Sequence, residues 1–160
     1  MDNNPFTQQL QGVRVLDISR VLAGPHCTAM LADLGADVIK FEVPEEGDDA
    51  RHLGPFLEGG SVYFGLINRG KRSVEIDFKN PAQRQLFYEL VADADVLVEN
   101  FLPGVTQRLG IDFDSLKQHN PRLIYASISG FGQQGPLSSR PAYDIVAQAM
   151  SGLMSVTGFA

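Results

Sequence analysis

The sequence is poor in cysteine and in long apolar runs, and it contains no tryptophan. Its 160 residues include a single cysteine, Cys27, which therefore has no partner for a disulfide within the chain. This usage fits a reducing compartment, and we expect a cytoplasmic protein. No apolar run approaches the roughly 20 residues of a membrane-spanning helix. Residues 1–7 are polar and lack the hydrophobic core of a signal peptide, so we expect no association with a membrane.

Positive charge is scarce as well. Thirteen Lys and Arg residues stand against nineteen Asp and Glu residues, which gives a net charge of −6. Such a chain lacks the basic face with which general nucleic-acid-binding proteins displace counterions from phosphates. The sequence also lacks the glycine-rich dinucleotide fingerprint and the P-loop motif. His26, His52 and His119 are not spaced like metal ligands, so we expect no metal site.

What is present is the composition of a globular domain, with 44% hydrophobic and 20% charged residues. A chain of this length buries roughly 70% of its unfolded surface, which is enough for one core. Apolar, β-branched runs alternate with segments of helical spacing. This alternation predicts a doubly wound α/β fold with a mostly parallel, Rossmann-like sheet. We expect strands at residues 13–18, 37–42, 73–78, 95–99 and 122–128, and helices at residues 25–34, from 81 onward, 105–109, 112–119 and 144–153.

Helical spacing of apolar residues marks the core-facing sides of two of these helices. We therefore expect Cys27 in the core. Residues 43–68 have no such periodicity and are interrupted by Gly and Pro. They predict a long loop, which is either functional or a surface excursion. The expected apolar faces consist of Cys27, Met30, Leu31 and Leu34, and of Leu86, Phe87, Leu90 and Val91.

Ligands of open parallel sheets bind beyond the carboxyl ends of the strands, where we expect loops at residues 19–25, 99–104 and 129–141. In the first loop, Gly24 precedes a helix whose free N–H groups suit an anion or a thioester; the alternative is a tight turn.

Several charged residues also leave two interpretations open. The three cations of Asn68–Ser73 either meet a polyanionic ligand or lie in a solvated turn. Arg108 is either a phosphate ligand or an isolated surface residue. Asp17, Asp37 and Asp144 flank strands or begin a helix, so we expect them to act as caps.

Seven segments, taken in order, resemble the family III coenzyme A transferases, the CaiB/BaiF group that includes formyl-CoA and carnitine-CoA transferases. The similarity begins near residue 11 and continues to the last residue. We therefore expect residues 1–10 to be a polar lead and residues 11–160 to be part of a CoA-binding large domain, truncated at its C-terminal end. The segments are G-V-R-V-L-D-I-S-R-V-L-A-G-P (12–25), L-G-A-D-V-I-K-F-E (34–42), G-D-D-A-R (47–51), N-R-G-K-R-S-V-E-I-D (68–77), A-D-V-L-V-E-N-F-L-P-G (94–104), S-I-S-G-F-G (127–132) and P-A-Y-D-I-V-A-Q-A-M-S-G-L-M-S-V-T-G (141–158).

The resemblance implies that CoA lies over the carboxyl ends of the sheet. Relatives often carry a basic residue after the acid of the second strand, but Val43 stands there, so we expect no cation stacked on adenine at this position. Tyr143 matches a position beside the CoA arm. The other matched contacts are Val21, Leu22 and Ala23 for the thioester and pantetheine arm, Ile76 and Lys79 for the nucleotide, and Asn100, Phe101 and Arg108 for the pyrophosphate and adenosine.

The resemblance also implies the reaction, in which CoA moves between a CoA thioester and a small carboxylic acid through an aspartyl intermediate, without a metal. In the family the nucleophilic aspartate follows the T-G-F segment, and none of this chain's aspartates stands at that position. We therefore expect the nucleophile beyond Ala160, an inactive fragment, and an interlocked homodimer for the full-length protein.

Two alternatives remain. One is an α-methylacyl-CoA racemase or dehydratase-type member of the same fold, and the other is a CoA-binding module without catalysis. The racemases use a histidine where this chain has Tyr143. Because the ordinary pKa of tyrosine lies far above neutral, it is a poor general base, which favours the transferase.

Overall fold

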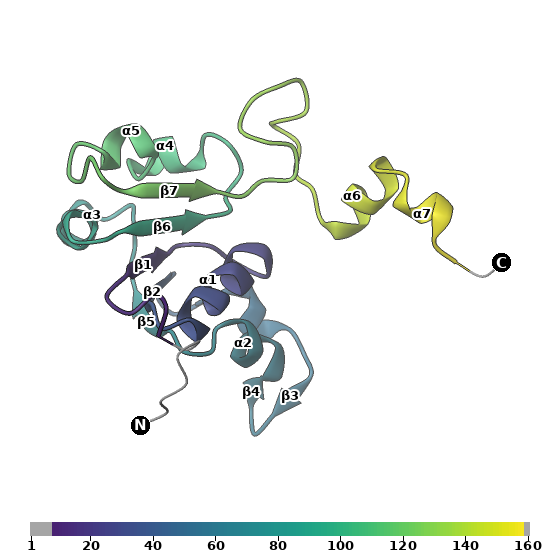
Figure 1. Cartoon of the computed structure of the whole chain (residues 1–160), viewed down its shortest axis with the longest axis horizontal. Coiled ribbons are helices and arrows are strands. Elements are labelled where there is room, and N and C mark those ends of the chain that lie inside the picture. Colours follow the sequence, from purple (N-terminus) through teal and green to yellow (C-terminus); the bar gives the residue numbers. More distant parts are fainter. Residues whose placement is uncertain (1–7, 159–160) are drawn as a thin grey trace.

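The computed structural model of the chain describes residues 8–158. Its centre is a sheet of five strands in which every neighbouring pair is parallel (Figure 1). The spatial order is β5-β2-β1-β6-β7, so the chain builds outward from β1 in both directions, as the predicted doubly wound α/β fold requires. The strands are β1 (Arg14–Asp17), β2 (Asp37–Glu42), β5 (Arg72–Glu75), β6 (Val96–Glu99) and β7 (Ile124–Ser127).

Alternate residues of β1 pack against the two faces of the sheet. Leu16 and, just beyond the strand, Ile18 belong to one buried cluster, together with Phe87. Val15 belongs to a second cluster, against which Leu31 packs. Because successive side chains of a strand point to opposite faces, a central strand covered on both sides must be apolar on both. The helices are α1 (Ala23–Asp33), α2 (Val62–Ile67), α3 (Pro81–Ala92), α4 (Val105–Leu109), α5 (Phe113–Leu116), α6 (Asp144–Met150) and α7 (Leu153–Val156).

The buried face of α1 differs from the expected one. Cys27 is exposed, so its expected place in the core is wrong, and Met30 is 53% exposed. The helix turns its small residues to the sheet instead, since these allow a close approach. Thr28 on this face donates from Oγ1 to Asp17 Oδ2 at 2.6 Å, which the apolar pattern could not indicate. The buried residues of α1 are Gly24, Pro25, Thr28 and Ala29.

Helix α3 begins as its sequence predicts. The Asn80 side chain accepts hydrogen bonds from the N–H groups of Ala82 and Gln83, which have no acceptor inside the helix. Phe87 and Val91 are buried against the sheet. Leu86, expected on the same face, is 59% exposed, so the apolar side of α3 is narrower than predicted.

Residues 43–68 are not the irregular loop that the sequence predicted. They contain a 3₁₀ helix at Asp49–His52, the short strands β3 (Phe56–Leu57) and β4 (Gly60–Ser61), and α2. Each element is too short to show a hydrophobic period. Ser61 caps α2 by accepting from the N–H of Phe64 at 3.0 Å, so local side-chain contacts, and not an apolar face, define this segment.

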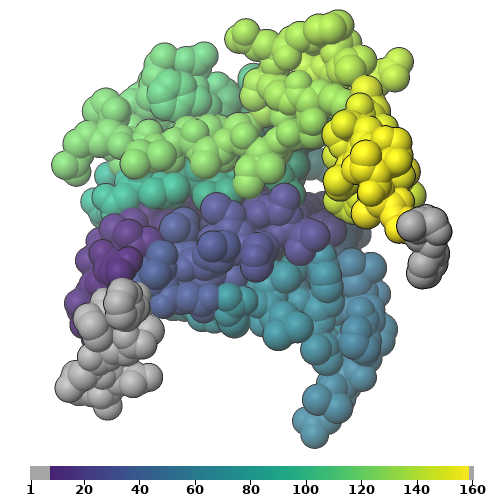
Figure 2. Space-filling view, turned by 45° about the vertical axis from the view of Figure 1, so that its right-hand side comes forward, coloured from purple at the N-terminus to yellow at the C-terminus, as the bar shows by residue number. Residues whose placement is uncertain are grey.

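Helices α6 and α7 leave the sheet at the C-terminal end of the chain (Figure 1), and they stand at one side of the body in Figure 2. Neither contains a buried residue. Tyr143, which precedes α6, is 75% exposed, and Val156 in α7 is 83% exposed. Within residues 8–158, no helix combines the length and the apolar character that crossing a membrane takes.

Candidate functional site

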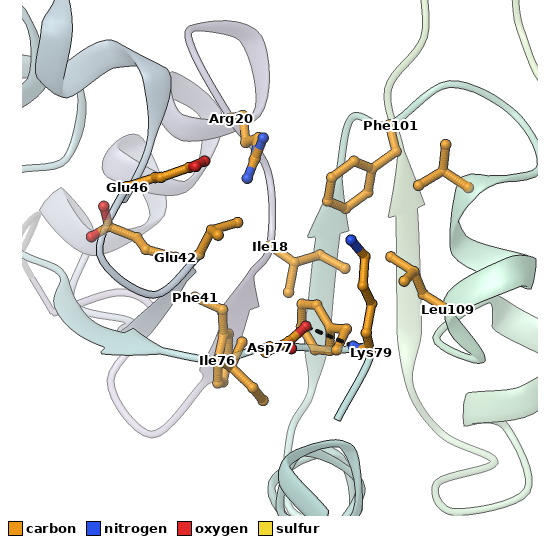
Figure 3. Close-up of a pocket in the computed structure, with 13 residues that line it drawn as sticks. Ile18, Arg20, Phe41, Glu42, Glu46, Ile76, Asp77, Lys79, Phe101 and Leu109 are labelled. Carbon is orange, nitrogen blue, oxygen red and sulfur yellow. Dashed lines mark hydrogen bonds between the residues drawn. The ribbon is translucent and has the colours of Figure 1, made fainter. Parts of the chain in front are cut away.

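The strand order reverses between β1 and β6, which is where ligands of open α/β sheets bind. β2 and β5 lie beyond β1, and β7 lies beyond β6. The loops that follow β1 and β6 therefore lead to opposite halves of the sheet and leave a crevice between them. A cavity of about 410 Å³ lies beside these loops. Its apolar wall includes Ile18, Phe41, Ile76 and Phe101, which come from the ends of four strands (Figure 3). The charged residues in its lining are Arg20, Glu42, Glu46, Asp77 and Lys79.

Lys79 brings a positive charge to this cavity. Its backbone N–H donates to Asp77 Oδ1 at 2.9 Å, and its side chain extends toward Phe101 (Figure 3). Arg20 supplies a second cation from the β1–α1 loop. The lining also holds three carboxylates, and Arg20 Nη1 lies 3.8 Å from Asp49 Oδ2. The apolar wall suits a flat ring, and Lys79 and Arg20 are the groups in this lining that favour phosphate. Ile76, Lys79 and Phe101, three of the predicted CoA contacts, are thus brought together.

The β1–α1 loop places the predicted thioester contacts at the start of α1. Leu22 and Ala23 are exposed, and Val21 is half-buried. The first N–H groups of a helix have no acceptor within it, and among residues 8–158 no side chain caps α1. The N–H groups of Ala23 and Gly24 therefore have no capping side chain, and Pro25 has no N–H. Gly24 lies against Ser19 so closely that a Cβ at this position would collide with the serine side chain. The absence of a side chain at Gly24 therefore allows the close packing of the helix start against Ser19. It also leaves no side chain at this position to cover the first N–H groups of α1.

A buried ion pair between Lys40 and Asp48 lies beneath this loop. Lys40 Nζ is 2.7 Å from Asp48 Oδ2 and donates to the carbonyl of Ser19 at 3.0 Å. Asp48 Oδ1 accepts from the N–H of Val21 at 3.0 Å and from that of Ala50 at 2.9 Å. Both charged side chains are only 1% exposed. The pair therefore joins β2 and residues 43–68 to the loop.

A second buried ion pair anchors the start of α1. Lys71 Nζ is 2.8 Å from Asp17 Oδ2 and donates to the carbonyl of Pro25 at 2.8 Å. Burial raises the pKa of Asp17, but attraction to Lys40 and Lys71 outweighs it and holds the pKa below its usual value. Burial lowers the pKa of Lys71, against the opposing attraction of Asp17. Asp17 is an ionised anchor inside the protein. Its Oδ1 also accepts from the N–H of Ser19 at 3.0 Å, so the capping role expected for it is limited to the turn after β1.

The three cations of residues 68–73 are all paired within the chain. Lys71 belongs to the buried pair just described, and Arg69 pairs with Asp33. Arg72 Nη2 lies 2.5 and 2.7 Å from the two carboxylate oxygens of Asp37. Asp37 thus joins neighbouring strands and is not the cap that was expected. Burial acts to raise its pKa, but the arginines outweigh this and lower it. The segment is neither a free polyanion site nor a merely solvated turn.

Asn100, a predicted CoA contact, uses its side-chain amide within the protein. Oδ1 accepts from the N–H of Arg20 at 2.8 Å, and Nδ2 donates to the carbonyl of Arg20 at 2.7 Å. Asn100 therefore fastens the β1–α1 loop to the loop that follows β6. Glu99, directly before it, is buried, and burial raises its pKa against hydrogen bonds from Ser127 and from the N–H of Phe101.

Glu42 at the end of β2 organises the segment that follows it. Arg51 grips its two carboxylate oxygens at 2.6 and 2.7 Å, and Ser73 and the N–H of Asp48 also donate to it. Burial raises the pKa of Glu42, but these donors outweigh burial and lower the pKa to about 2. The carboxylate is therefore ionised at neutral pH and holds Asp48 in place beside Lys40.

Val21, Leu22, Ala23 and Asn100 lie outside the cavity lining, and two further predicted contacts do so as well. Arg108 is exposed in the last turn of α4, outside the cavity lining, although Val105 and Leu109 of the same helix belong to it. Tyr143 is exposed before α6. Asp144 lies in the first turn of α6, where it accepts from the side chain of Gln148 and makes no cap.

Sequence patterns missed the two buried lysines. Lys40 is a charged residue inside the apolar strand D-V-I-K-F-E, and this is the only feature of the sequence that indicates a buried ion pair there. A buried charge needs a partner of opposite charge. Nothing in the sequence indicates which acid that partner is. Asp48 stands in the G-D-D-A-R segment, 8 residues away, and Lys71 pairs with an aspartate 54 residues away.

Fold and crevice together define an α/β protein with a cavity at the carboxyl edge of a parallel sheet, the place where proteins of this architecture bind ligands. Residues 10–160 match CoA-transferase family III, and the chain belongs to this family. The predicted resemblance is therefore confirmed.

Individual relatives agree with this assignment. An acetyl-CoA:oxalate CoA-transferase of Acetobacter aceti is 53% identical over 92% of this chain and 38% of that protein. A succinyl-CoA:glutarate CoA-transferase of Mus musculus is 49% identical over 93% of this chain and 34% of that protein. The crystal structure of a CaiB/BaiF family protein from Brucella suis superposes with a TM-score of 0.90 at 48% identity, covering 95% of this chain and 41% of that chain. The chain thus spans between a third and two-fifths of the length of these relatives.

Proposed function

We propose that the protein is a CoA-transferase that moves coenzyme A from a CoA thioester to a small carboxylic acid. The observation that carries this proposal is the crevice between β1 and β6, lined by Ile76, Lys79 and Phe101, in a chain of CoA-transferase family III. Residues 11–160 are then part of the CoA-binding large domain. The relatives named above act on acetyl-CoA and oxalate and on succinyl-CoA and glutarate, which supports an acyl-CoA and a small carboxylic acid as the substrates.

In this proposal the nucleotide end of CoA lies in the cavity. Ile76 and Phe101 contact its apolar surfaces, while Lys79 and Arg20 face its phosphates. Arg108 reaches the phosphates from the rim, and charge-assisted contacts of this kind are strong. The pantetheine arm runs to the uncapped start of α1, where free N–H groups and the helix dipole favour the partial negative charge of a thioester oxygen.

The transfer itself is proposed to use an aspartate. Its carboxylate attacks the donor thioester carbonyl, the C–S bond breaks, and CoA leaves as the thiolate, so that a mixed anhydride of the aspartate and the donor acid is formed. The thiolate then attacks the aspartyl carbonyl and expels the donor acid, and the acceptor acid takes CoA by the same two steps in reverse. Asp17 and Asp48 contact the loop, but both are buried and held by lysines. None of the chain's other aspartates, Asp77 in the cavity lining included, stands after the T-G-F segment as the family's nucleophile does. We therefore propose that the nucleophile is an aspartate outside these 160 residues.

We also propose that the protein acts as a homodimer. Support comes from α6 and α7, whose apolar side chains are exposed. Ile145 is 65% exposed, Met150 58% and Val156 83%, and exposed apolar surface of this extent is typical of a region that packs against another chain.

Calorimetric titration with CoA tests the binding part of the proposal. Lys79→Ala and Arg108→Ala should each weaken binding, because each removes a cation that faces phosphate. Lys117→Ala is the matched control, since Lys117 pairs with Asp114 on α5 and is absent from the cavity lining. Equal affinity in all four proteins would contradict the proposed site.

Assays on the product of the complete gene test the reaction. A transferase converts acetyl-CoA and oxalate, or succinyl-CoA and glutarate, into the exchanged thioester and acid. Loss of an α-deuterium label from a 2-methylacyl-CoA without such exchange would instead show a racemase. Binding of CoA without either reaction would show a module that does not catalyse.

A further inference from the structure

We propose that Asp48 is a positioning residue for the thioester end of CoA, acting through the backbone of Val21. This inference rests on the proposed CoA site. Asp48 lies in the segment between β2 and α2, below the loop. Its Oδ1 accepts from the N–H of Val21 at 3.0 Å and thereby holds the residue that precedes Leu22, the N-cap of α1.

Val21 has a backbone conformation that its side chain disfavours. Its φ is +66°, in the left-handed region, where a β-branched residue is a marked outlier. For an L-residue this region is less populated by about 5- to 30-fold than the ordinary one. Surrounding contacts must therefore impose the conformation, and such residues cluster where a ligand is handled.

The residues on either side of Val21 are fixed by other contacts. Arg20 is held at both its N–H and its carbonyl by Asn100. Further on, Lys71 binds the carbonyl of Pro25. The carbonyl of Arg20 and the N–H of Val21 belong to one planar peptide group, which Asn100 holds at the oxygen and Asp48 holds at the N–H. The bond to Asp48 acts on the nitrogen about which the φ angle of Val21 turns. If this bond is lost, Val21 can return to a negative φ, and the N–H groups of Leu22 and Ala23 turn away from the site.

Asp48 is itself held rigidly. Lys40 Nζ lies 2.7 Å from Oδ2, the N–H of Ala50 donates to Oδ1, and the backbone N–H of Asp48 donates to Glu42 Oε2 at 3.0 Å. A buried carboxylate with this many partners fixes its neighbour more firmly than a surface side chain does. The fold therefore uses the segment after β2 to set the geometry of the loop after β1.

The test uses two substitutions of Asp48 in two backgrounds. Asp48→Ala removes the acceptor of the Val21 N–H, whereas Asp48→Asn keeps an oxygen there. Each is made with Val21 and with Val21→Gly, because glycine populates left-handed and right-handed φ about equally. CoA affinity is measured by calorimetry and folding by thermal melting, on the protein expressed from its complete gene.

With Val21 present, Asp48→Ala should weaken CoA binding by about 5- to 30-fold, and Asp48→Asn should weaken it less. In the Val21→Gly background the further loss caused by Asp48→Ala should be no more than about twofold, because glycine has no preference to overcome. The drop in melting temperature caused by Asp48→Ala should be similar in both backgrounds, since the unpaired Lys40 is common to them.

An equal loss of affinity in both backgrounds would overturn the inference and leave Asp48 with a structural role alone. Absence of CoA binding by the unaltered protein would overturn the proposed function instead. Should Asp48→Ala fail to fold, Asp48→Asn and Asp48→Ala are compared in a Lys40→Met background, where no buried ammonium lacks a partner. The same difference between the two variants, and its loss with Val21→Gly, is then expected.

Discussion

Asn100 holds Arg20 at both ends of its peptide backbone, although the two residues are 80 positions apart. One amide side chain, at the carboxyl end of β6, thus fixes the loop at the carboxyl end of β1. The two strands are neighbours at the centre of the sheet, with Leu16 beside Leu97. The contact therefore joins the two loops at the position where the strand order reverses, and these loops form one wall of the candidate CoA site.

Replacing Asn100 by alanine should weaken both folding and CoA binding. Two half-buried backbone groups of Arg20 lose their partners, which is expected to reduce the free energy of unfolding by about 1–3 kcal/mol. Asn80→Ala is the control, because Asn80 caps α3 and its loss also costs about 1 kcal/mol. Urea unfolding and calorimetric titration with CoA should show destabilisation in both variants and weaker affinity in Asn100→Ala alone. Unchanged affinity in Asn100→Ala would show that the clamp does not shape the site.

Replacing Lys71 by methionine should destabilise the protein severely. Its ammonium is the direct partner of Asp17, and both side chains are almost fully buried, so a charge is left without its partner inside the protein. Breaking such a pair typically costs about 3–5 kcal/mol. Arg69→Met removes a cation from a neighbouring, exposed pair with Asp33 and should cost about 0–1 kcal/mol. Urea unfolding followed by circular dichroism measures both, and similar losses would contradict the proposed importance of burial.

The pKa of Glu42 predicts a loss of stability in acid. The pKa is lowered from 4.5 to about 2 in the folded protein, so the carboxylate stabilises the fold above the higher value. This contribution, about 3 kcal/mol, should disappear as the pH falls from about 4.5 towards 2. Glu42→Gln lacks the titrating group, so the difference in urea midpoint between it and the unaltered protein should shrink over this range. A difference that stays constant with pH would exclude Glu42 as its source.

The central strands were predictable because burial on both faces makes them apolar throughout. The strand at Asp37–Glu42 has the predicted bounds. The edge strand β5 does not, since it ends at Glu75 and all its residues are exposed, which leaves no apolar run to mark it. The apolar Ile76 and Phe78 of the predicted strand lie beyond it and contribute to the cavity.

The candidate site was predictable only in outline. The loops at the carboxyl ends of the strands, and the resemblance to a CoA-binding family, indicated where a ligand binds. The contacts that shape the loop were not visible, because they join residues far apart in sequence, as Lys71 and Asp17 do. Asp48 reaches Val21 from 27 residues away, through a hydrogen bond to a backbone group that no sequence pattern marks.

The place of β1 in the sheet also bears on the order of events during synthesis. β1 can pair with β2 once about 40 residues have emerged from the ribosome. Its other neighbour, β6, and the side-chain amide of Asn100, which binds the backbone of Arg20, are synthesised only some 60 residues later. Until then one edge of β1 stays open and the loop after it has no fixed shape. Contacts of such long sequence separation form slowly, so the ribosome-bound chain passes through a stage with a paired β1–β2 edge and no finished ligand site.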